Sequence, residues 1–452
     1  MIPIVAPEEM RAVDAAAPEP AEVLIERAGA AVAQAALRML GGTYGRRVVV
    51  LAGKGNNGAD GRAAARRLAA RGVRVQVLEA DAVPAEVPDC DLVIDAAYGT
   101  GFHGDWWAPD PGRARVLAVD IPSGVDGRTG AAVPGVLPAD RTVTFAALKP
   151  GLLMPPGSVL AGALEVADIG LDVGAARAHL VQQRDVAEWV PARSTDAHKW
   201  RAATWVVAGS GGMLGAAHLA ARSAQRAGAG MVRLSIPGIG NDPAAPTEVV
   251  VRPLPSTAWH REVLDDLDRF HSLVVGPGLG RADATAASVR ALVQAAPLPV
   301  VVDGDGLFAL AWNPEGAAAG LRGRESATVL TPHDGEYALL RGVRVGRDRL
   351  EAARYLAAEL DVVVLLKGPT TVVAEPGGDT LVVTAGDERL ATAGSGDVLA
   401  GVVGALLAAQ VPAFEAAAAG AWLHGMAGRR GASRGLVAGD LPDLLPLVLD
   451  DL

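Results

Sequence analysis

The chain has 452 residues, too many for one ordinary core, so we expect two or three domains, with two as the simplest number. Its formal net charge is −10 and it has few aromatic residues, which argues against nucleic acid as a partner. The single cysteine, Cys90, excludes an internal disulfide framework and a cysteine-rich zinc site. We find no secretory signal and no apolar run of membrane-spanning length, and therefore expect a soluble cytoplasmic protein without a membrane partner.

In the first half, segments typical of strands alternate with segments typical of helices. Apolar residues at helical spacing predict a helix from about Pro20 to Leu40. A second helix is predicted at residues 62–71. Strands are predicted at residues 47–51, 73–78, 92–96, 116–121 and 142–145. This alternation predicts a mainly parallel sheet covered on both faces.

The glycine-rich loop GKGNNGADG stands between the first of these strands and the following helix. Strand, glycine-rich loop and helix form the geometry that brings phosphates to a helix N-terminus. The loop matches neither the P-loop nor the dinucleotide fingerprint. Its side chains Asn56, Asn57 and Asp60 add oxygen ligands suited to a hard cation.

Polar residues also follow the later strands of this half. Asp95 ends one predicted strand, and Asp120 and Ser123 stand at the end of the next. Open α/β sheets bind ligands at the carboxyl ends of their strands, so we expect a site there. A strand-capping carboxylate is the alternative role for Asp120, and a turn residue is the alternative role for Asn57.

The ordered motifs GKGNNGADG, DAAYGTGF, AVDIPSGVDG and TFAALKPGLL resemble those of the NAD(P)H-hydrate epimerases over about residues 8–170. The resemblance implies that Asp120 is the acid or base and that K⁺ is held by Asn57, Asp95 and Ser123. It also implies that the hydrated nucleotide contacts two loops, formed by Asn56, Asn57, Gly58, Ala59 and Asp60 and by Gly99, Thr100, Gly101, Phe102, His103, Gly104 and Asp105. The C6 hydrate is a carbinolamine that can ionise or ring-open and reclose on its other face, and a positioned carboxylate would assist either route.

This half departs from the family pattern at two places. Ala59 stands where the family usually has glycine, and residues 102–115 are shorter than the family's helix-bearing connection. A new pattern begins near residue 176, where we place the domain boundary.

In the second half, strands are predicted at residues 204–208, 271–275, 300–302, 328–330 and 362–366, with a helix at 216–227. The apolar run from Val398 to Val411 predicts a buried helix. Glycine-rich or polar segments follow the strands: GSGGMLGA, GPGLG, DGDGL, TPHDGE and KGPTT.

Three residues of this half have an ordinary structural role as the alternative to a functional one. Lys367 suits nucleotide phosphates, but a solvated lysine is equally common after a strand. His333 taken alone is more often a hydrogen-bonded loop histidine. The stretch LATAGSGDVLAG places free backbone N–H groups and the Asp397 carboxylate at a helix N-terminus, as an anion cradle or as a simple helix cap.

The order of these segments resembles the ribokinase-type superfamily, and HK at 198–199 with AGAGMV, TPHDGE and TAGSGDVLAG resembles the ADP-dependent NAD(P)H-hydrate dehydratases over about residues 177–445. The resemblance implies that Ala216, Gly278, His333 and Asp397 contact the hydrated dinucleotide. The adenine nucleotide would be held by Lys367, Gly368, Pro369, Thr370, Thr371 and Gly396. The family's glycine after HK is Trp200 here.

The chemistry of the implied reaction depends on the leaving group. Hydroxide leaves C6 badly, whereas a phosphate ester leaves well. Asp397 as general base would activate the C6 hydroxyl for attack on the terminal phosphate of ADP, while backbone amides and Mg²⁺ absorb the phosphoryl charge.

The fold class expected from these patterns is α/β. We expect a Rossmann-like three-layer α/β/α epimerase domain at residues 1–176 and a ribokinase-like dehydratase domain at residues 177–452. The two resemblances imply repair of NADHX and NADPHX: epimerisation of their R and S forms and ADP-dependent dehydration of the S form, giving AMP and phosphate. We also expect a homo-oligomer. The alternatives are a ribokinase-type small-molecule kinase fused to an inactive binding module, and a nucleotide-sensing or partner-binding first half without catalysis.

Overall fold

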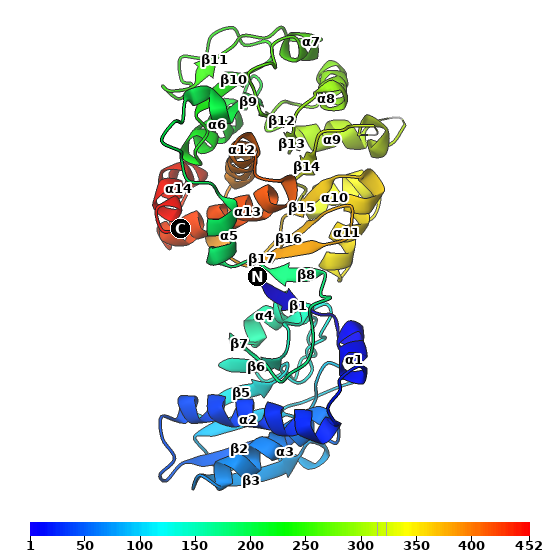
Figure 1. Ribbon diagram of the computed structural model, residues 1–452, viewed down its shortest axis with the longest axis vertical. Helices are drawn as coiled ribbons and strands as arrows, with labels where there is room; N and C mark the ends of the chain where they lie inside the picture. Colours follow the sequence, from blue (N-terminus) through cyan, green and yellow to red (C-terminus); the bar gives the residue numbers. More distant parts are fainter. Residues whose placement is uncertain (314, 322) are drawn as a thin grey trace. The chain divides into compact units, whose positions relative to one another are not determined.

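The computed structural model describes residues 1–313, 315–321 and 323–452 (Figure 1). The chain divides into two compact units, one of residues Ile2–Ala178 and the other of His179–Leu452 with Met1. Within the described residues, no helix has the length and apolarity needed to cross a membrane.

The first unit is built on a parallel sheet with the strand order β3-β2-β4-β5-β6-β7. The strands of this sheet are β2 (Arg47–Ala52), β3 (Arg74–Glu79), β4 (Leu92–Ala96), β5 (Arg115–Val119), β6 (Arg141–Phe145) and β7 (Ala163–Ala167). The unit also contains the short strand β1 (Ile2–Ile4), which is not part of this sheet. Its α-helices are α1 (Pro7–Ala15), α2 (Ala21–Leu40), α3 (Asn56–Ala69) and α4 (Gly157–Leu160). The predicted α/β class is confirmed, and β4 has the predicted bounds.

Alternate residues of the strands face two separate cores, because successive strand side chains point to opposite faces. Val48 and Val50 of β2 pack with α2 and α3 in one core. Val49 and Leu51 belong to the other core, whose cover comes from connecting segments that include Trp106. Residues 97–114, between β4 and β5, contain no helix.

Two local predictions for this unit are wrong. The glycine-rich loop was expected to precede a helix at residue 62, but α3 begins at Asn56, so the two asparagines lie in its first turn. A Cβ on Gly58 would stand 1.9 Å from the Gly53 carbonyl oxygen, and this close approach brings the first turn of α3 against the end of β2. The strand expected to reach Ile121 ends at Val119, because Asp120 adopts a left-handed φ of 65°.

The second unit has a mixed sheet with the order β8-β17-β16-β15-β14-β13-β12-β9-β10-β11. Its strands are β8 (Ala178–Leu180), β9 (Ala203–Val207), β10 (Met231–Ser235), β11 (Val250–Val251), β12 (Ser272–Val275), β13 (Val300–Val302), β14 (Thr328–Leu330), β15 (Val363–Leu366), β16 (Thr371–Ala374) and β17 (Thr380–Val383). Strands β9 to β15 pair in parallel, and β15, β16 and β17 pair antiparallel.

The α-helices of the second unit are α5 (Gln183–Trp189), α6 (Leu214–Arg226), α7 (His260–Leu264), α8 (Asp283–Ala295), α9 (Asp305–Ala311), α10 (Asp334–Arg341), α11 (Arg349–Leu360), α12 (Ser395–Ala408), α13 (Ala413–Arg430) and α14 (Leu441–Leu449). Strands β13 and β14 have the predicted bounds, and the buried helix predicted at 398–411 is α12, shifted by three residues toward the N-terminus.

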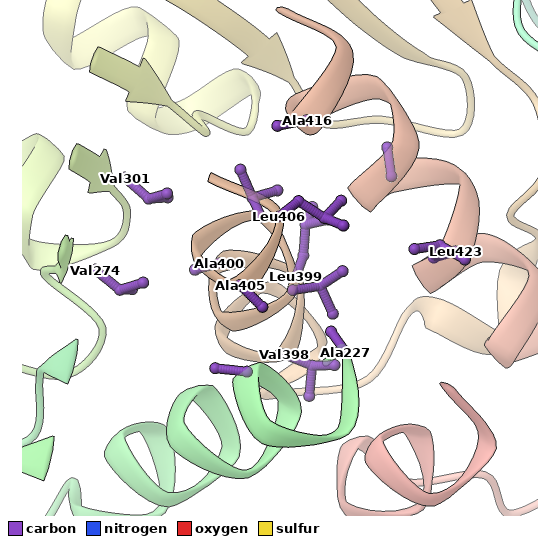
Figure 2. Close-up of a cluster of buried hydrophobic side chains, with 14 of the residues drawn as sticks. Ala227, Val274, Val301, Val398, Leu399, Ala400, Ala405, Leu406, Ala416 and Leu423 are labelled. Carbon is purple, nitrogen blue, oxygen red and sulfur yellow. The ribbon is translucent and has the colours of Figure 1, made fainter. Parts of the chain in front are cut away.

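Helix α12 is the centre of the core of the second unit, and all of its residues from Val398 to Ala408 are buried. Figure 2 shows its apolar side chains among those of neighbouring strands and helices, such as Val274, Val301 and Leu423. A Cβ on Gly401 would lie 2.1 Å from the Ala220 carbonyl oxygen, so this glycine lets α12 and α6 touch backbone to backbone. This packing fixes the position of the helix whose N-terminus carries the GSGD turn.

Candidate active sites

The GSGD turn forms the first turn of α12. Gly394 has φ 92°, in the left-handed region, and Ser395, Gly396 and Asp397 follow as the first helical residues. The Ser395 hydroxyl donates to the Leu390 carbonyl at 2.9 Å. The first backbone N–H groups of a helix have no intrahelical acceptor, so this turn presents donors and a partial positive charge to an anion.

Lys367 and two carboxylates meet at the carboxyl ends of β13, β14 and β15. The Lys367 Nζ lies 2.8 Å from Asp303 Oδ1 and 3.6 Å from Glu336 Oε2. Thr331 Oγ1 donates to the same Asp303 oxygen at 2.6 Å. A Cβ on Gly396 would lie 3.4 Å from this Nζ, so the GSGD turn stands directly beside the cluster.

The charges of this cluster act on one another. Burial raises the pKa of Asp397 to about 7, the Asp303 carboxylate adds to the rise, and the Lys367 ammonium opposes it. Burial disfavours the charge on Lys367, but Asp303 and Glu336 outweigh it and raise the pKa of that ammonium. Asp397 is therefore a carboxyl whose pKa suits proton transfer near neutral pH.

Three glycine-rich turns adjoin this edge of the sheet. A Cβ on Gly278, which has φ 62°, would come within 2.9 Å of the Ala216 Cβ, so these two predicted dinucleotide contacts are neighbours. The Ser210 hydroxyl donates to the Gly278 carbonyl at 2.8 Å, and Gly280 N–H donates to Asp305 Oδ2 at 2.9 Å. The turns are thus tied together by hydrogen bonds.

His333 caps helix α10. Its Nδ1 accepts from the backbone N–H groups of Gly335 at 3.0 Å and Glu336 at 3.2 Å, while the Glu336 carboxylate accepts from the His333 N–H at 2.9 Å. The side chain is 59% exposed. A ring whose Nδ1 accepts carries its proton on Nε2, which is left to donate.

The predicted nucleotide segment forms the turn of the β15–β16 hairpin. Gly368 and Pro369 are exposed and Thr370 is buried, while Thr371 begins β16. Arg349 Nη2 donates to the Lys367 carbonyl at 2.8 Å and fixes the start of the turn.

The HK segment lies away from this cluster. His198, Lys199 and Trp200 line a cavity of about 1470 Å³ together with Leu406 and Gln410. These last two residues stand at the C-terminal end of α12, about 20 Å along the helix from the GSGD turn. The HK segment and Asp397 therefore lie near opposite ends of α12.

In the first unit, Asn57 lies in the first turn of α3 against Gly99, where an added Cβ would be 3.5 Å from the Asn57 Cγ. Both polar atoms of the Asn57 amide are buried and have no hydrogen-bond partner among the described residues. Leaving such a group unsatisfied costs roughly 1–3 kcal/mol, which points to a missing ligand.

Asp95 and Ser123 are in direct contact. The Asp95 carboxylate accepts from Ser123 Oγ at 2.6 Å and from Ser123 N–H at 2.9 Å. Burial raises the pKa of Asp95, and the hydrogen bonds from Ser123 oppose the rise. The Ser123 hydroxyl oxygen also accepts from Tyr98 N–H at 2.8 Å, which joins the pair to the loop after β4.

Asp120 stands in a separate buried cluster. Its Oδ1 lies 2.5 Å from the Lys149 Nζ and accepts from Thr144 Oγ1 at 2.9 Å. Burial raises the pKa of Asp60 to about 8, with further rises from the carboxylates of Asp120 and Asp14. Burial is also the first cause of the raised pKa of Asp14, on α1.

Of the loop predicted to hold the hydrated nucleotide, the part nearest β4 is the better packed. The rings of Tyr98 and Phe102 lie 4.9 Å apart between centroids, and a Cβ on Gly127 would touch Thr100 at 3.0 Å. Further along, the exposed residues are Gly101, His103, Gly104 and Asp105.

Sequence reasoning missed several members of these clusters. Lys149 and Asp14 were given no role, although Lys149 is the one cation in the apolar motif TFAALKPGLL. Asp303 and Glu336 belong to the segments DGDGL and TPHDGE, which were predicted to follow strands, but they were not linked to Lys367. The burial of a charged side chain depends on contacts distant in sequence, so only the position of each residue after a strand gave a signal.

A family model for NAD(P)H-hydrate dehydratase matches residues 204–448, and a model for the YjeF-related protein N-terminus matches residues 21–86 and 79–151. The bifunctional NAD(P)H-hydrate repair enzyme Nnr of Moorella thermoacetica is 37% identical over an alignment that covers 96% of this chain and 93% of the relative. The chain belongs to the bifunctional NAD(P)H-hydrate repair enzymes. The enzyme of the same name from Escherichia coli is 32% identical over 90% of this chain and 85% of its own length.

Solved structures match the second unit of this repair enzyme. The ADP/ATP-dependent NAD(P)H-hydrate dehydratase of Bacillus subtilis, co-crystallised with ATP/Mg²⁺, has a TM-score of 0.52 and 30% identity, covering 60% of this chain and 97% of that one. A ribokinase-like superfamily protein from Enterococcus faecalis, at TM-score 0.52 and 20% identity, covers 61% of this chain and 96% of its own and shows the fold alone. The predicted repair function and ribokinase-like fold are confirmed, and family membership decides against the small-molecule kinase.

Proposed function

We propose that Asp397 is the general base of the dehydratase and that ADP is the phosphoryl donor. The observation that carries this is a partly buried carboxyl with a pKa of about 7, set at a helix N-terminus beside Lys367. Asp397 takes the proton of the C6 hydroxyl, and the oxygen attacks the terminal phosphorus as its bond to the leaving AMP oxygen breaks. The ring nitrogen then expels phosphate from C6, and loss of a C5 proton to the phosphate restores NADH or NADPH.

The two substrates are assigned to different parts of this edge. The α12 amides at Gly396 and the Lys367 ammonium would stabilise the phosphates, and the hairpin turn Gly368–Thr371 would hold the rest of the nucleotide. Ala216, Gly278 and the Nε2–H of His333 would contact the hydrated dinucleotide. The ADP/ATP dependence of the Bacillus subtilis dehydratase supports an adenine nucleotide as the donor.

A magnesium ion fits the donors present. Asp303, Asp305 and Glu336 all contribute to the raised pKa of Asp397, so carboxylates exceed the single nearby ammonium. Among the described residues, no group of three or more acidic, histidine or cysteine side chains forms a metal cage by itself. Mg²⁺ is commonly held by one or two carboxylates together with substrate phosphates, and when bound it would offset phosphoryl charge.

The dehydratase proposal is tested with Asp397→Asn in the full chain. Mixed R- and S-NADHX is incubated with ADP and Mg²⁺, and NADH absorbance is followed. We expect a loss of roughly 100-fold or more in dehydration rate, because general-base catalysis is removed. Asp268→Asn, at an exposed position, is the matched control. Dehydration at the control's rate in Asp397→Asn would remove Asp397 from the mechanism.

For the epimerase we propose that Asp120 is the acid/base residue, that the loops 56–60 and 99–105 hold the substrate, and that K⁺ lies among Asn57, Asp95 and Ser123. The orphaned Asn57 amide supports the ion, since its oxygen lacks a partner in a buried position. Amide, carboxylate and hydroxyl oxygens suit a hard cation, which would hold the first turn of α3 to the loop after β4. We assign residues 1–176 to this domain and 177–452 to the dehydratase.

The role of Asp120 is tested by supplying R-NADHX and S-NADHX separately to Asp120→Asn with ADP. The variant should consume the S form at the normal rate, because the dehydratase residues are unchanged, and should consume the R form only at the spontaneous rate. Asp89→Asn, whose side chain is 84% exposed, is the control. Enzymatic use of the R form by Asp120→Asn would show that another group moves the proton.

A further inference from the structure

Lys149 is a buried ammonium with every donor engaged. Its side chain is 2% exposed, and Nζ donates to Asp120 Oδ1 at 2.5 Å, to Thr144 Oγ1 at 2.9 Å and to the Phe145 carbonyl at 3.1 Å. A lysine ammonium has three N–H donors, so these partners use all of them. Lys149 therefore has no donor left to bind a substrate phosphate directly.

The contacts of Lys149 converge on one carboxylate oxygen. Thr144 Oγ1 accepts a hydrogen bond from Lys149 and donates one to Asp120 Oδ1, to which Lys149 also donates. This set of three side chains is therefore joined in a ring of hydrogen bonds. Asp120 is held from the backbone as well, since its N–H donates to the Val143 carbonyl at 2.7 Å. The carboxylate of Asp120 has its Oδ1 fixed by this set, and Oδ2 is left to act on a ligand.

Other carboxyls face this ammonium from neighbouring elements. Asp14 on α1 and Asp60 on α3 both interact with Lys149 and with Asp120. Only Asp120 is in salt-bridge contact with the lysine among the described residues. The Lys149 ammonium therefore contacts the Asp120 carboxylate, at the end of β5, and interacts with Asp14 and Asp60 only at longer range.

A purely structural role explains this arrangement poorly. Removing two charges from water offsets most of their attraction, so a buried ion pair is weak evidence for stability. The pair also lies where strands β5 and β6 end, the edge at which parallel sheets bind ligands. We propose that Lys149, supported by Thr144, is a positioning residue that holds Oδ1 of Asp120 and so fixes the direction of its free oxygen during epimerisation; this rests on the acid/base role proposed for Asp120.

The test measures the kcat and KM of R-NADHX epimerisation by the full enzyme. ADP and an excess of dehydratase convert the S form to NADH, whose absorbance is followed. Lys149→Met should lower kcat by roughly 10- to 100-fold with KM little changed, because the carboxylate is misplaced while the binding loops stay intact. Thr144→Val keeps the lysine but removes one of the two side chains that hold Asp120 Oδ1, so kcat should fall by a smaller factor, again with KM little changed.

The matched control is Thr142→Val, on the same strand, which removes a buried hydrogen bond from Thr142 Oγ1 to the Ala161 carbonyl. It should change neither kcat nor KM. An unchanged kcat in Lys149→Met overturns the inference while leaving Asp120 in place, provided Asp120→Asn is inactive. If Lys149→Met does not fold, Thr144→Val decides: a kcat equal to that of Thr142→Val overturns the inference. An active Asp120→Asn would instead contradict the proposed function itself.

Discussion

At the scale of single residues, the partly buried Asp397 and the buried Asp60 both have raised pKa values, with different consequences. Burial is the first cause at both, with neighbouring carboxylates second. Asp397 must lose its proton to act as a base, whereas Asp60 is held in its protonated form at neutral pH. The raised pKa of Asp397 therefore affects the rate of dehydration, and that of Asp60 affects the stability of the first unit.

The pKa of about 7 at Asp397 predicts a pH-dependent dehydration rate. The base is active only when ionised, so kcat/KM for S-NADHX should fall as pH decreases through about 7. Initial rates of NADH formation between about pH 5.5 and 8.5 measure this limb. Asp120→Asn, which alters only the epimerase, should show the same limb. A flat profile across that range would contradict the prediction.

Asp60 predicts a pH-dependent stability. Its folded pKa of about 8 lies above the ordinary value of 3.8, so its contribution is fully present below pH 3.8 and is lost as pH rises through about 8. Asparagine resembles the protonated form, so Asp60→Asn should raise the free energy of unfolding by about a few kcal/mol more at pH 8.5 than at pH 5. Denaturant unfolding of both proteins at the two pH values measures the difference, and an equal effect at both would count against it.

The positions of most candidate site residues were predictable because they follow strands. Asp95, Asp303, Thr331 and Lys367 all stand at carboxyl ends, and parallel pairing brings them to one edge of each sheet. Which of them share a proton or a hydrogen bond was not predictable. The pairing of Lys149 with Asp120 depends on the path of the chain after β6 ends at Phe145, and no local sequence pattern predicts that path.

At the scale of elements, the start of α3 shows where local propensity fails. Asn and Gly are poor helix formers, so NNGADG predicts a loop. Contacts distant in sequence overcome this, since a Cβ on Gly61 would stand 2.5 Å from the Ala96 Cβ of β4. By contrast, α12 was predictable from its unbroken apolar run, because a helix that is hydrophobic all round must be buried.

The contact of α12 with α6 predicts a steric effect at Gly401. Its added Cβ would lie 2.1 Å from a backbone oxygen, which cannot move aside as a flexible side chain can. Gly401→Ala should therefore lower the free energy of unfolding by about 1–3 kcal/mol, although alanine favours helix. Gly215→Ala on α6 is the control, since its Cβ meets nothing within 4 Å in the part of the chain described. Equal stabilities in denaturant would show that the helices can separate without cost.

At the scale of the whole molecule, the fold class followed from the alternation of apolar runs with glycine-rich turns, and the change of pattern near residue 176 indicated a second core. The structure has separate cores in its two units. What the sequence did not predict is the cover of the first sheet's second face by connecting segments, because such segments lack a periodic signal.

Because the two units have separate cores, we expect a ligand of one unit to stabilise that unit and not the other. ADP with Mg²⁺ should raise the unfolding temperature of the second unit, because a ligand that binds only the folded state stabilises it by mass action, by about 2.7 kcal/mol at 100 times Kd. Calorimetry of the full chain with and without nucleotide should show one transition moving and another unchanged. In Lys367→Met the movement should be much reduced. Two transitions that move together would contradict the prediction.

The left-handed backbone at Asp120 has a consequence for how this protein can evolve. A non-glycine residue in that region carries strain of about 1 kcal/mol, which glycine would relieve. Replacing Asp120 by glycine would relieve this strain, but it would also leave the buried Lys149 ammonium without its carboxylate, and breaking a buried pair costs roughly 3–5 kcal/mol. Loss of the reactive group would therefore weaken the first unit, so the aspartate at this position serves the fold as well as the reaction.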